Sequence, residues 1–394
     1  MLLARWLAPE AYGAYTVAYT VFLLLSVVHQ GVLTEPMLVF GTERFRDRLA
    51  AYLGVVVRGH AAVTALGAVV LGAAALGVWA WGGPPVLAVG LAAIGVGQAG
   101  ILLTWLARST SYVTFDPRRS AEAGALYAVL LLGGTWALYA LGGLGHGRPS
   151  EVAVAVGVMA AAGVVAGLWL LRRAGVWPLP PADPGLRAQA VAAHRGYGPW
   201  AAAAGGVDWL AGYLPVLWLS AAGGLAEAGA LRALYNLALP ALHVWQAMGT
   251  LLVPVLVRAI AGGRGGRTVA ALAAAALGGG LAYLAVLAVA GGPLLHALYD
   301  GKFDGYAGHM LLLGAVPVVV GVVVVLLSTL RALERPRALF TARVVALAAV
   351  VGPVLAVGGI GTVRAALGTI VAIGAASVLA LGALAAAEFR RRTA

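Results

Sequence analysis

The sequence predicts an all-α, polytopic integral membrane protein with about eleven transmembrane helices in two related bundles. Hydrophobic residues make up 62% of the 394 residues, charged residues make up only 10%, and the mean hydropathy is +0.95. A soluble globular domain carries about 25% charged residues. Long apolar runs also recur along the chain, and the loops between them alternate between basic and nearly non-basic. These three observations exclude a soluble globular domain.

The apolar runs have the length of membrane-spanning helices. About 20 predominantly apolar residues cross the hydrocarbon core of a bilayer, and short charged or Gly/Pro-rich segments separate the runs. The longest polar stretch is the loop 172–196, so there is no room for a separate soluble domain. The expected spans are 12–40, 51–79, 86–107, 121–142, 151–171, 197–221, 228–257, 268–290, 306–330, 338–357 and 363–386.

The loops predict how these spans are oriented. The basic loops are 41–50, 108–120, 172–196, 258–267, 331–337 and the tail 387–394. The intervening loops, in which Arg148 and Lys302 are the basic residues, are 80–85, 143–150, 222–227, 291–305 and 358–362. Because Lys and Arg are enriched in cytoplasmic loops, we expect the basic loops and the C-terminus to be cytoplasmic. The net charge of +12 is spread over short loops instead of one face, so it does not predict nucleic-acid binding.

The Pro-rich loop 172–196 divides the chain into two parts that resemble each other. Gln30 and Gln246 lie at the same distance along the chain from Gly13 and Gly229, which open the first and seventh spans. Such a repeat predicts the same helical bundle twice, in parallel orientation. The expected domains are an N-terminal bundle of five spans that is an incomplete six-helix bundle, a cytoplasmic linker and a C-terminal six-helix bundle, at 1–171, 172–196 and 197–394.

A polar stripe runs along the seventh expected span. At 100° per residue, its polar side chains fall on one side of a helix that is otherwise apolar. Polar groups inside a bilayer are costly unless they face water, protein or a substrate, so we expect this stripe to line a substrate cavity. The stripe consists of Arg232, Asn236, His243, Gln246 and Thr250, with Tyr235 at its edge.

Four residues in other spans are further candidates. Gln30 lies on a polar side of the first span and joins the expected cavity, whereas Arg58 either binds an anionic group there or extends to the membrane surface. Asp208 is a candidate for ion coupling, because burial would favour its neutral form; the alternative is a structural ion pair with an arginine. Glu35 is a second coupling candidate, and its alternative is a hydrated carboxylate at the inner interface.

Other motifs point to packing more than to chemistry. His29 and His243 are candidates for a proton relay, since histidine titrates near neutral pH, but hydrogen-bonded packing is the alternative for both. The segment 95–100, GVGQAG, lies within an apolar span and predicts close helix packing instead of a dinucleotide site. The sequence contains no HExxH, GxSxG or Walker motif and no cysteine, so we expect neither an enzyme nor a cofactor or metal site.

Several segments together resemble a known family. LARWLAPEAYGAY at Leu3–Tyr15, ALRALYNLALP at 230–240, LLHALYDGKFDGY at 294–306 and TLRALERPRALF at 329–340 are similar to Wzx-type polysaccharide flippases. These flippases, which act on lipid-linked oligosaccharides, belong to the multidrug/oligosaccharidyl-lipid/polysaccharide exporter (MOP) superfamily. The resemblance implies twelve helices in two six-helix bundles around a central cavity, so this chain lacks the leading helix of the pattern.

The resemblance also implies a function and a location. We expect translocation of undecaprenyl-diphosphate-linked oligosaccharide across the bacterial inner membrane, for O-antigen or exopolysaccharide assembly. The expected partners are this lipid-linked oligosaccharide, membrane lipids, and H⁺ or Na⁺ as a coupling ion. Arg58 and Arg232 would attract the diphosphate. The alternatives are a drug or cation antiporter of the same superfamily, a membrane polysaccharide polymerase or ligase, and a remnant that does not transport.

Overall fold

The computed structural model describes residues 1–393 except 43, 115, 182, 334 and 357, and the side chains at 42, 204, 250, 254, 336–338, 392 and 393 lie outside that description. In the described residues the regular secondary structure is helical throughout, as expected for an all-α membrane protein. The contacts divide the chain into two compact units. We call residues 6–209 the N-terminal bundle, and residues 1–5 with 210–394 the C-terminal bundle.

Five long helices, α2 and α4–α7, build most of the N-terminal bundle. Proline occupies the first turn of α2, α5 and α6, where its missing N–H removes no helical hydrogen bond. After the short α1 (Leu2–Trp6), the elements in order are α2 (Pro9–His29), the π-helix η1 (Gln30–Thr34), α3 (Glu35–Thr42), η2 (Arg46–Arg48), α4 (Leu49–Ala80), α5 (Pro85–Val113), α6 (Pro117–Ala140), α7 (Ser150–Arg173) and the first part of α8 (Pro184–Ala222).

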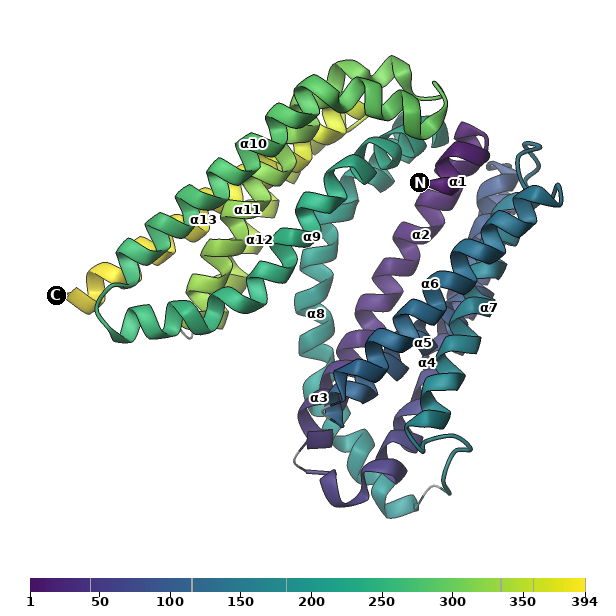
Figure 1. Cartoon of the computed structure of the whole chain (residues 1–394), viewed down its shortest axis with the longest axis horizontal. Coiled ribbons are helices and arrows are strands. Elements are labelled where there is room, and N and C mark those ends of the chain that lie inside the picture. Colours follow the sequence, from purple (N-terminus) through teal and green to yellow (C-terminus); the bar gives the residue numbers. More distant parts are fainter. Residues whose placement is uncertain (43, 115, 182, 334, 357, 394) are drawn as a thin grey trace. The chain divides into compact units, whose positions relative to one another are not determined.

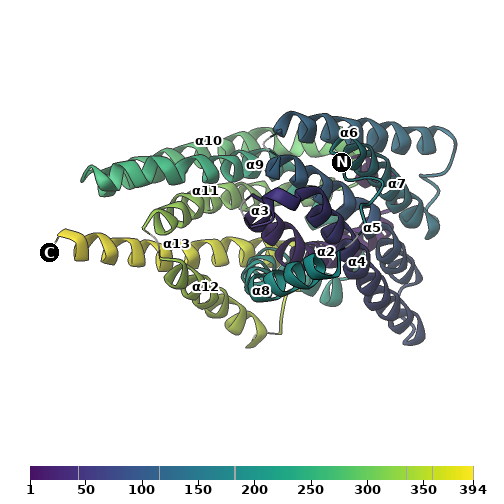
Figure 2. The same cartoon turned by 90° about the horizontal axis from the view of Figure 1, so that it is seen from below.

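The C-terminal bundle repeats this arrangement. In the N-terminal bundle α5 packs on α2, α4 and α7, and α6 packs on α7 (Figure 1). In the C-terminal bundle α11 packs on α9, α10 and α13, and α12 packs on α13. Figure 2 shows α11 lying between α10 and α13. The elements are α9 (Leu225–Ala261), α10 (Gly265–Tyr299), η3 (Asp304–His309), α11 (Met310–Ala332), α12 (Pro336–Ala356) and α13 (Val363–Thr393). The same packing order in both units agrees with the sequence repeat.

Ten of the eleven expected spans correspond to helices that are long and apolar enough to cross a membrane. In the described part of the chain nine helices pass this test singly, and α9 passes it as two segments, Leu225–Gly249 and Leu251–Ala261, bent by 43°. The remaining expected span, 197–221, is helical within α8 but is not among these candidates. Its sequence includes Asp208, Gly205, Gly206, Gly212, Pro215 and several aromatic residues, which lower its hydropathy.

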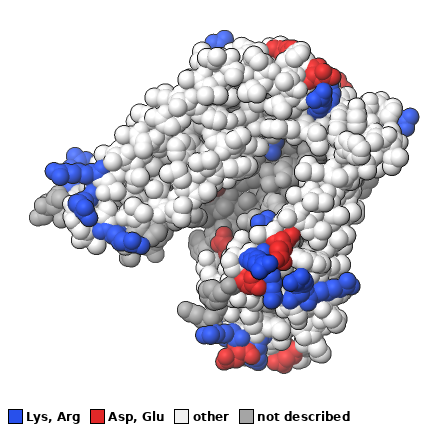
Figure 3. Space-filling view, in the orientation of Figure 1, with Lys and Arg blue, Asp and Glu red and all other residues white. Residues whose placement is uncertain are grey.

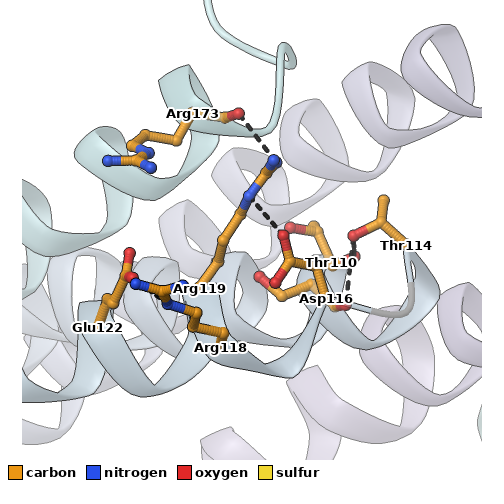
Figure 4. A network of polar contacts seen from close by, with 8 residues as sticks. Thr110, Thr114, Asp116, Arg118, Arg119, Glu122 and Arg173 are labelled. Atoms are coloured by element: carbon orange, nitrogen blue, oxygen red, sulfur yellow. Dashed lines mark hydrogen bonds and ion pairs between the residues drawn. The ribbon is translucent and has the colours of Figure 1, made fainter.

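The basic loops meet at one end of each bundle. In the N-terminal bundle Arg48 of η2 pairs with Asp183 of the 172–196 loop at 3.6 Å. At the α5–α6 turn, Arg119 pairs with Asp116 at 2.7 Å and donates a hydrogen bond to the Arg173 carbonyl at 3.1 Å (Figure 4). Figure 3 shows the charged side chains gathered near helix ends, with largely uncharged flanks.

The basic end of the C-terminal bundle is held in a similar way. Arg335, which follows α11, pairs at 3.0 Å with Glu388 near the end of α13. A second arginine of α13, Arg391, lies 3.4 Å from the same carboxylate. Within each bundle, the loops predicted to share one membrane side therefore lie together.

The boundary between the two units falls inside α8 and not in the 172–196 loop that we expected to separate the domains. The first part of α8 packs tightly on α2 and η1, because glycines allow the two backbones to approach: a Cβ on Gly198 would lie 2.9 Å from the Cα of Val32. The indole of Trp209 then donates a hydrogen bond to the Thr20 carbonyl at 3.0 Å. These contacts assign the start of α8 to the N-terminal bundle.

The segment 95–100 packs closely, as predicted from its glycines. A Cβ on Gly97 would lie 2.7 Å from Val156 of α7, and one on Gly100 would clash with the Ala160 backbone. The Thr104 hydroxyl donates to the Gly163 carbonyl at 2.6 Å, which adds a hydrogen bond between the same two helices. Small residues of this kind allow membrane helices to approach closely.

Candidate functional site

The first half of α9 turns part of the predicted stripe toward the other helices of the C-terminal bundle. Asn236 is 5% exposed, and its amide donates a hydrogen bond to the Tyr299 hydroxyl of α10 at 3.3 Å. That hydroxyl in turn donates to the Ala233 carbonyl at 3.1 Å. The two bonds fix the Asn236 side chain between α9 and α10.

Arg232 lies one turn before Asn236 and is half-buried. Its charge acts on three tyrosines of the same bundle: Tyr213 of α8, Tyr235 of α9 and Tyr299 of α10. A guanidinium offers five N–H donors in a planar fork and stays charged, and phenol hydroxyls add further donors. This arrangement suits a phosphate or carboxylate, which accepts several charge-assisted hydrogen bonds at once.

The second half of the stripe has a different environment. His243 and Gln246 are exposed on the surface of the bundle, and the Thr250 side chain lies outside the described residues. The structure therefore brings Arg232, Tyr235 and Asn236 together with tyrosines of α8 and α10, and leaves the other predicted members apart from them. Their role in binding stays a prediction.

In the N-terminal bundle, Gln30 and Glu35 mark the two ends of a change in helical pattern. The π-helix η1 begins at Gln30, and the N–H of Glu35 bonds the Gln30 carbonyl. Gln30 is half-buried, whereas Glu35 is exposed and hydrogen-bonds Tyr197 of α8. Single-turn π-helices occur frequently at functional sites. The sequence pattern gave no sign of this one.

Arg58 and Asp208 have surroundings that the sequence did not predict. The guanidinium of Arg58 donates to the Pro180 carbonyl at 2.6 Å, so this exposed arginine ties α4 to the 172–196 loop. The expectation that Asp208 is buried is wrong, because it is exposed on α8. Its neighbour Trp209 is buried against α2, and adjacent helical residues point about 100° apart, so the packing of Trp209 turns Asp208 away. The ion-coupling role of Asp208 stays a prediction without the support of burial.

Sequence reasoning missed a buried pair of histidines. Nε2 of His29 on α2 lies 2.9 Å from Nδ1 of His60 on α4, and their ring planes are almost perpendicular, at 86°. The two residues are 1% and 6% exposed. His29 was a candidate from sequence, but His60 lies 31 residues later on another helix, and no periodicity connects them. The available signal was a second histidine within an apolar span.

A second missed network lies at the basic end of the N-terminal bundle. His194 of α8 hydrogen-bonds the Val32 carbonyl through Nδ1 and the Tyr52 hydroxyl through Nε2, each at 2.8 Å. Because a carbonyl only accepts, Nδ1 carries the proton and Nε2 accepts from Tyr52 in the neutral ring. Burial lowers the pKa of His194, and the bond to the Val32 carbonyl opposes this shift.

No group of three or more His, Asp or Glu side chains is placed to hold a metal ion in the part of the chain that the structure describes. The side chains that α9 and its neighbours offer are a guanidinium, an amide and phenol hydroxyls, which bind anionic and polar groups.

Comparison of the sequence with known proteins finds no match, whereas comparison of the structure finds several. No family model matches the sequence, and neither does any curated protein sequence. The structure is similar to a multidrug resistance MATE-family transporter of the MOP superfamily in its inward-facing conformation, with a TM-score of 0.81 and 13% identity, covering 99% of this chain and 94% of that one. For the outward-facing conformation the TM-score is 0.67 at 13% identity, with 99% and 90% covered.

The lipid II flippase MurJ in an inward closed conformation is also similar, with a TM-score of 0.65 at 11% identity over 96% of this chain and 82% of that one. The likeness to these structures extends over nearly the whole chain. The chain therefore has the fold found in transporters and flippases of the MOP superfamily, which confirms the predicted fold class.

Proposed function

We propose that the protein is a flippase that moves undecaprenyl-diphosphate-linked oligosaccharide across the bacterial inner membrane by alternating access. The product would enter O-antigen or exopolysaccharide assembly. The observation that carries the proposal is the position of Arg232 on α9, half-buried beside Asn236 and acting on three tyrosines. A cation in a mostly apolar helix favours an anionic substrate over a cationic one.

The substrate chemistry matches this group of side chains. A diphosphate presents several acceptor oxygens to the guanidinium, and sugar hydroxyls both donate to and accept from amide and phenol groups. The oligosaccharide and diphosphate would follow the polar face of α9, while the polyprenyl chain stays in the surrounding lipid. The basic end of each bundle would lie in the cytoplasm. The candidate coupling ion for transport is H⁺ or Na⁺.

A drug or cation antiporter is the second candidate function. It is favoured by the similarity to a multidrug resistance MATE-family transporter at a TM-score of 0.81. Cationic drugs bind favourably beside acidic side chains, whereas Arg232 is itself cationic and its charge acts on three tyrosines and on the Met1 amino group. The charge at Arg232 therefore distinguishes the two candidates.

The test is a leaflet assay in proteoliposomes with a fluorescent undecaprenyl-diphosphate-linked oligosaccharide. We expect wild type to move the label between leaflets, and Arg232→Ala to lower kcat/KM roughly 10- to 100-fold, because hydrogen bonds to charged groups contribute about 1.5–3 kcal/mol. Arg232→Lys keeps the charge and should lose less. Arg331→Ala, at the exposed basic end of α11, is the matched control.

A result that contradicts the proposal is equal activity in wild type and Arg232→Ala. A wild-type protein that leaves the lipid label in place but exports an organic cation against a proton gradient would identify the antiporter instead.

A further inference from the structure

The surroundings of the His29–His60 contact favour one arrangement of protons. A hydrogen bond between two ring nitrogens needs one donor and one acceptor. The Ala99 backbone on α5 favours a proton on the His60 ring, and since Nδ1 of His60 faces His29, the nitrogen favoured for that proton is Nε2. His60 Nδ1 is then the acceptor and His29 Nε2 is the donor. In the neutral pair, Nδ1 of His29 is left with a bare lone pair.

That lone pair has no partner. In the described residues Nδ1 of His29 is buried and makes no hydrogen bond, although His29 is 1% exposed. Buried polar atoms nearly always find a partner, and an exception calls for an explanation. A histidine that serves packing alone would have both nitrogens satisfied. Of the four ring nitrogens of this pair, Nδ1 of His29 is the one recorded as buried without a hydrogen bond among the described residues.

A change in helical pattern and a cavity both lie close to the pair. His29 ends α2, and η1 starts at the next residue, where the N–H of Gln30 is shared between the Ser26 and Val27 carbonyls. A cavity of ≈ 200 Å³ lies beside this break, lined by Leu33 and Gly59, each close in sequence to one histidine, and by His194 and Arg195 toward the basic end. Its walls are mostly apolar, and neither histidine of the pair lines it.

Few titratable groups lie near the pair on α2, α3, α4, α5 and the first part of α8. On α5 no ionisable residue lies between Pro85 and Ala107. Arg58 of α4 bonds the Pro180 carbonyl, and Glu35 bonds Tyr197. The nearest ionisable residues along the other elements are Tyr19, Glu35, Arg58, His194, Arg195, Tyr197 and Asp208. Neither ring contacts a carboxylate among the described residues, so a proton on the pair would be a buried positive charge.

We propose that the His29–His60 pair is a proton-binding site of the N-terminal bundle, in which one proton from water adds to Nδ1 of His29. The new N–H bond makes His29 an imidazolium that still donates from Nε2 to His60, so the contact between α2 and α4 survives a single protonation. A second proton, on His60 Nδ1, would remove the acceptor and separate the rings. The claim that this proton drives transport rests on the proposed function, whereas the claim that the pair binds a proton does not.

Two substitutions distinguish the hydrogen bond between the rings from the basic nitrogen of His29. His29→Gln places an amide N–H near the position of Nε2, so it keeps a donor to His60 but has no basic nitrogen. His60→Asn places an amide oxygen near the position of Nδ1, so it keeps the acceptor and leaves the His29 ring free to titrate. His146→Gln, in the exposed 143–150 loop, removes another of the seven histidines and serves as the control.

The experiment is ¹⁵N NMR of ring-labelled histidines in the full chain in lipid nanodiscs, from about pH 8 to about pH 5, around the ordinary histidine pKa of about 6.5. We expect one of the unprotonated Nδ1 signals to be present in wild type, His60→Asn and His146→Gln and absent in His29→Gln, which assigns it to His29. This signal should be replaced by that of a protonated ring as the pH falls. A His29 ring that stays neutral over the whole range in both wild type and His60→Asn would overturn the proposal.

A leaflet assay with a pH gradient then tests the link to transport. Loss of gradient dependence in His29→Gln, with His146→Gln unchanged, would support it. If wild type moves no lipid-linked substrate, the proposed function fails, and the NMR result still decides the proton site.

Discussion

Replacing Gly163 by Ala tests the close packing that holds the N-terminal bundle together. Gly163 lies on α7 against α5, and a Cβ there would lie 2.6 Å from the carbonyl carbon of Gly100 and 3.0 Å from the amide nitrogen of Ile101. Non-bonded carbon atoms ordinarily lie about 3.5 Å apart or more. The helices would have to move apart by roughly 1 Å, because the obstacle is backbone and cannot change rotamer.

The cost has three parts. Overpacking in a well-packed core typically costs about 1–3 kcal/mol. Separating the helices also stretches the 2.6 Å hydrogen bond from Thr104 to the Gly163 carbonyl, which contributes about 1 kcal/mol. Alanine gains up to about 1 kcal/mol over glycine in a helix and offsets that loss. We therefore expect Gly163→Ala to lower the free energy of unfolding by about 1–3 kcal/mol.

Gly157 provides a matched control on the same helix. A Cβ at Gly157 meets nothing within 4 Å, so Gly157→Ala should leave stability unchanged or raise it by up to about 1 kcal/mol. The assay is reversible unfolding of the purified protein in mixed micelles, followed by circular dichroism. If Gly163→Ala is as stable as Gly157→Ala, the close approach of α5 and α7 does not stabilise the fold and the reasoning fails.

Two further predictions concern other contacts. Burial holds the pKa of His194 below its value in the unfolded chain, so the unfolded state binds more protons as the pH falls below about 6.5. Thermal stability should therefore decrease with acidification, and His194→Gln should make stability depend less steeply on pH. An identical pH dependence in both proteins would contradict this. Glu227 accepts hydrogen bonds from the Tyr306 hydroxyl at 2.7 Å and the Val363 N–H at 3.2 Å. Glu227→Gln should cost about 1–3 kcal/mol and speed hydrogen exchange at the Val363 amide, and unchanged exchange there would argue against the role of this carboxylate.

Local composition was enough to predict the class of protein. Whether a segment such as 268–290 can span a bilayer depends on the residues within it, since each apolar side chain lowers the transfer free energy independently of the rest of the chain. The grouping of the basic loops followed for a related reason: consecutive spans alternate in direction, so every second loop returns to the same end. The Arg48–Asp183 and Arg335–Glu388 pairs confirm this within the two bundles.

Part of the candidate site was also accessible from the sequence. Helical periodicity placed Arg232 and Asn236 on one face of a single helix, and both lie there. Their partner Tyr299 could not be predicted, because it belongs to α10 and nothing local fixes the rotation of one helix against another. The expected burial of Asp208 failed for the same reason: the packing of Trp209 on α2 sets the rotation of α8.

The amino-acid sequence by itself determined that this chain lies in a membrane, where most of its apolar spans lie, and which loops share an end, since these follow from short-range hydropathy and charge. Only the tertiary structure decided which polar groups meet. His29 and His60 are 31 residues apart on α2 and α4, and their contact depends on how the two helices pack. That packing is a property of the whole bundle and not of either segment.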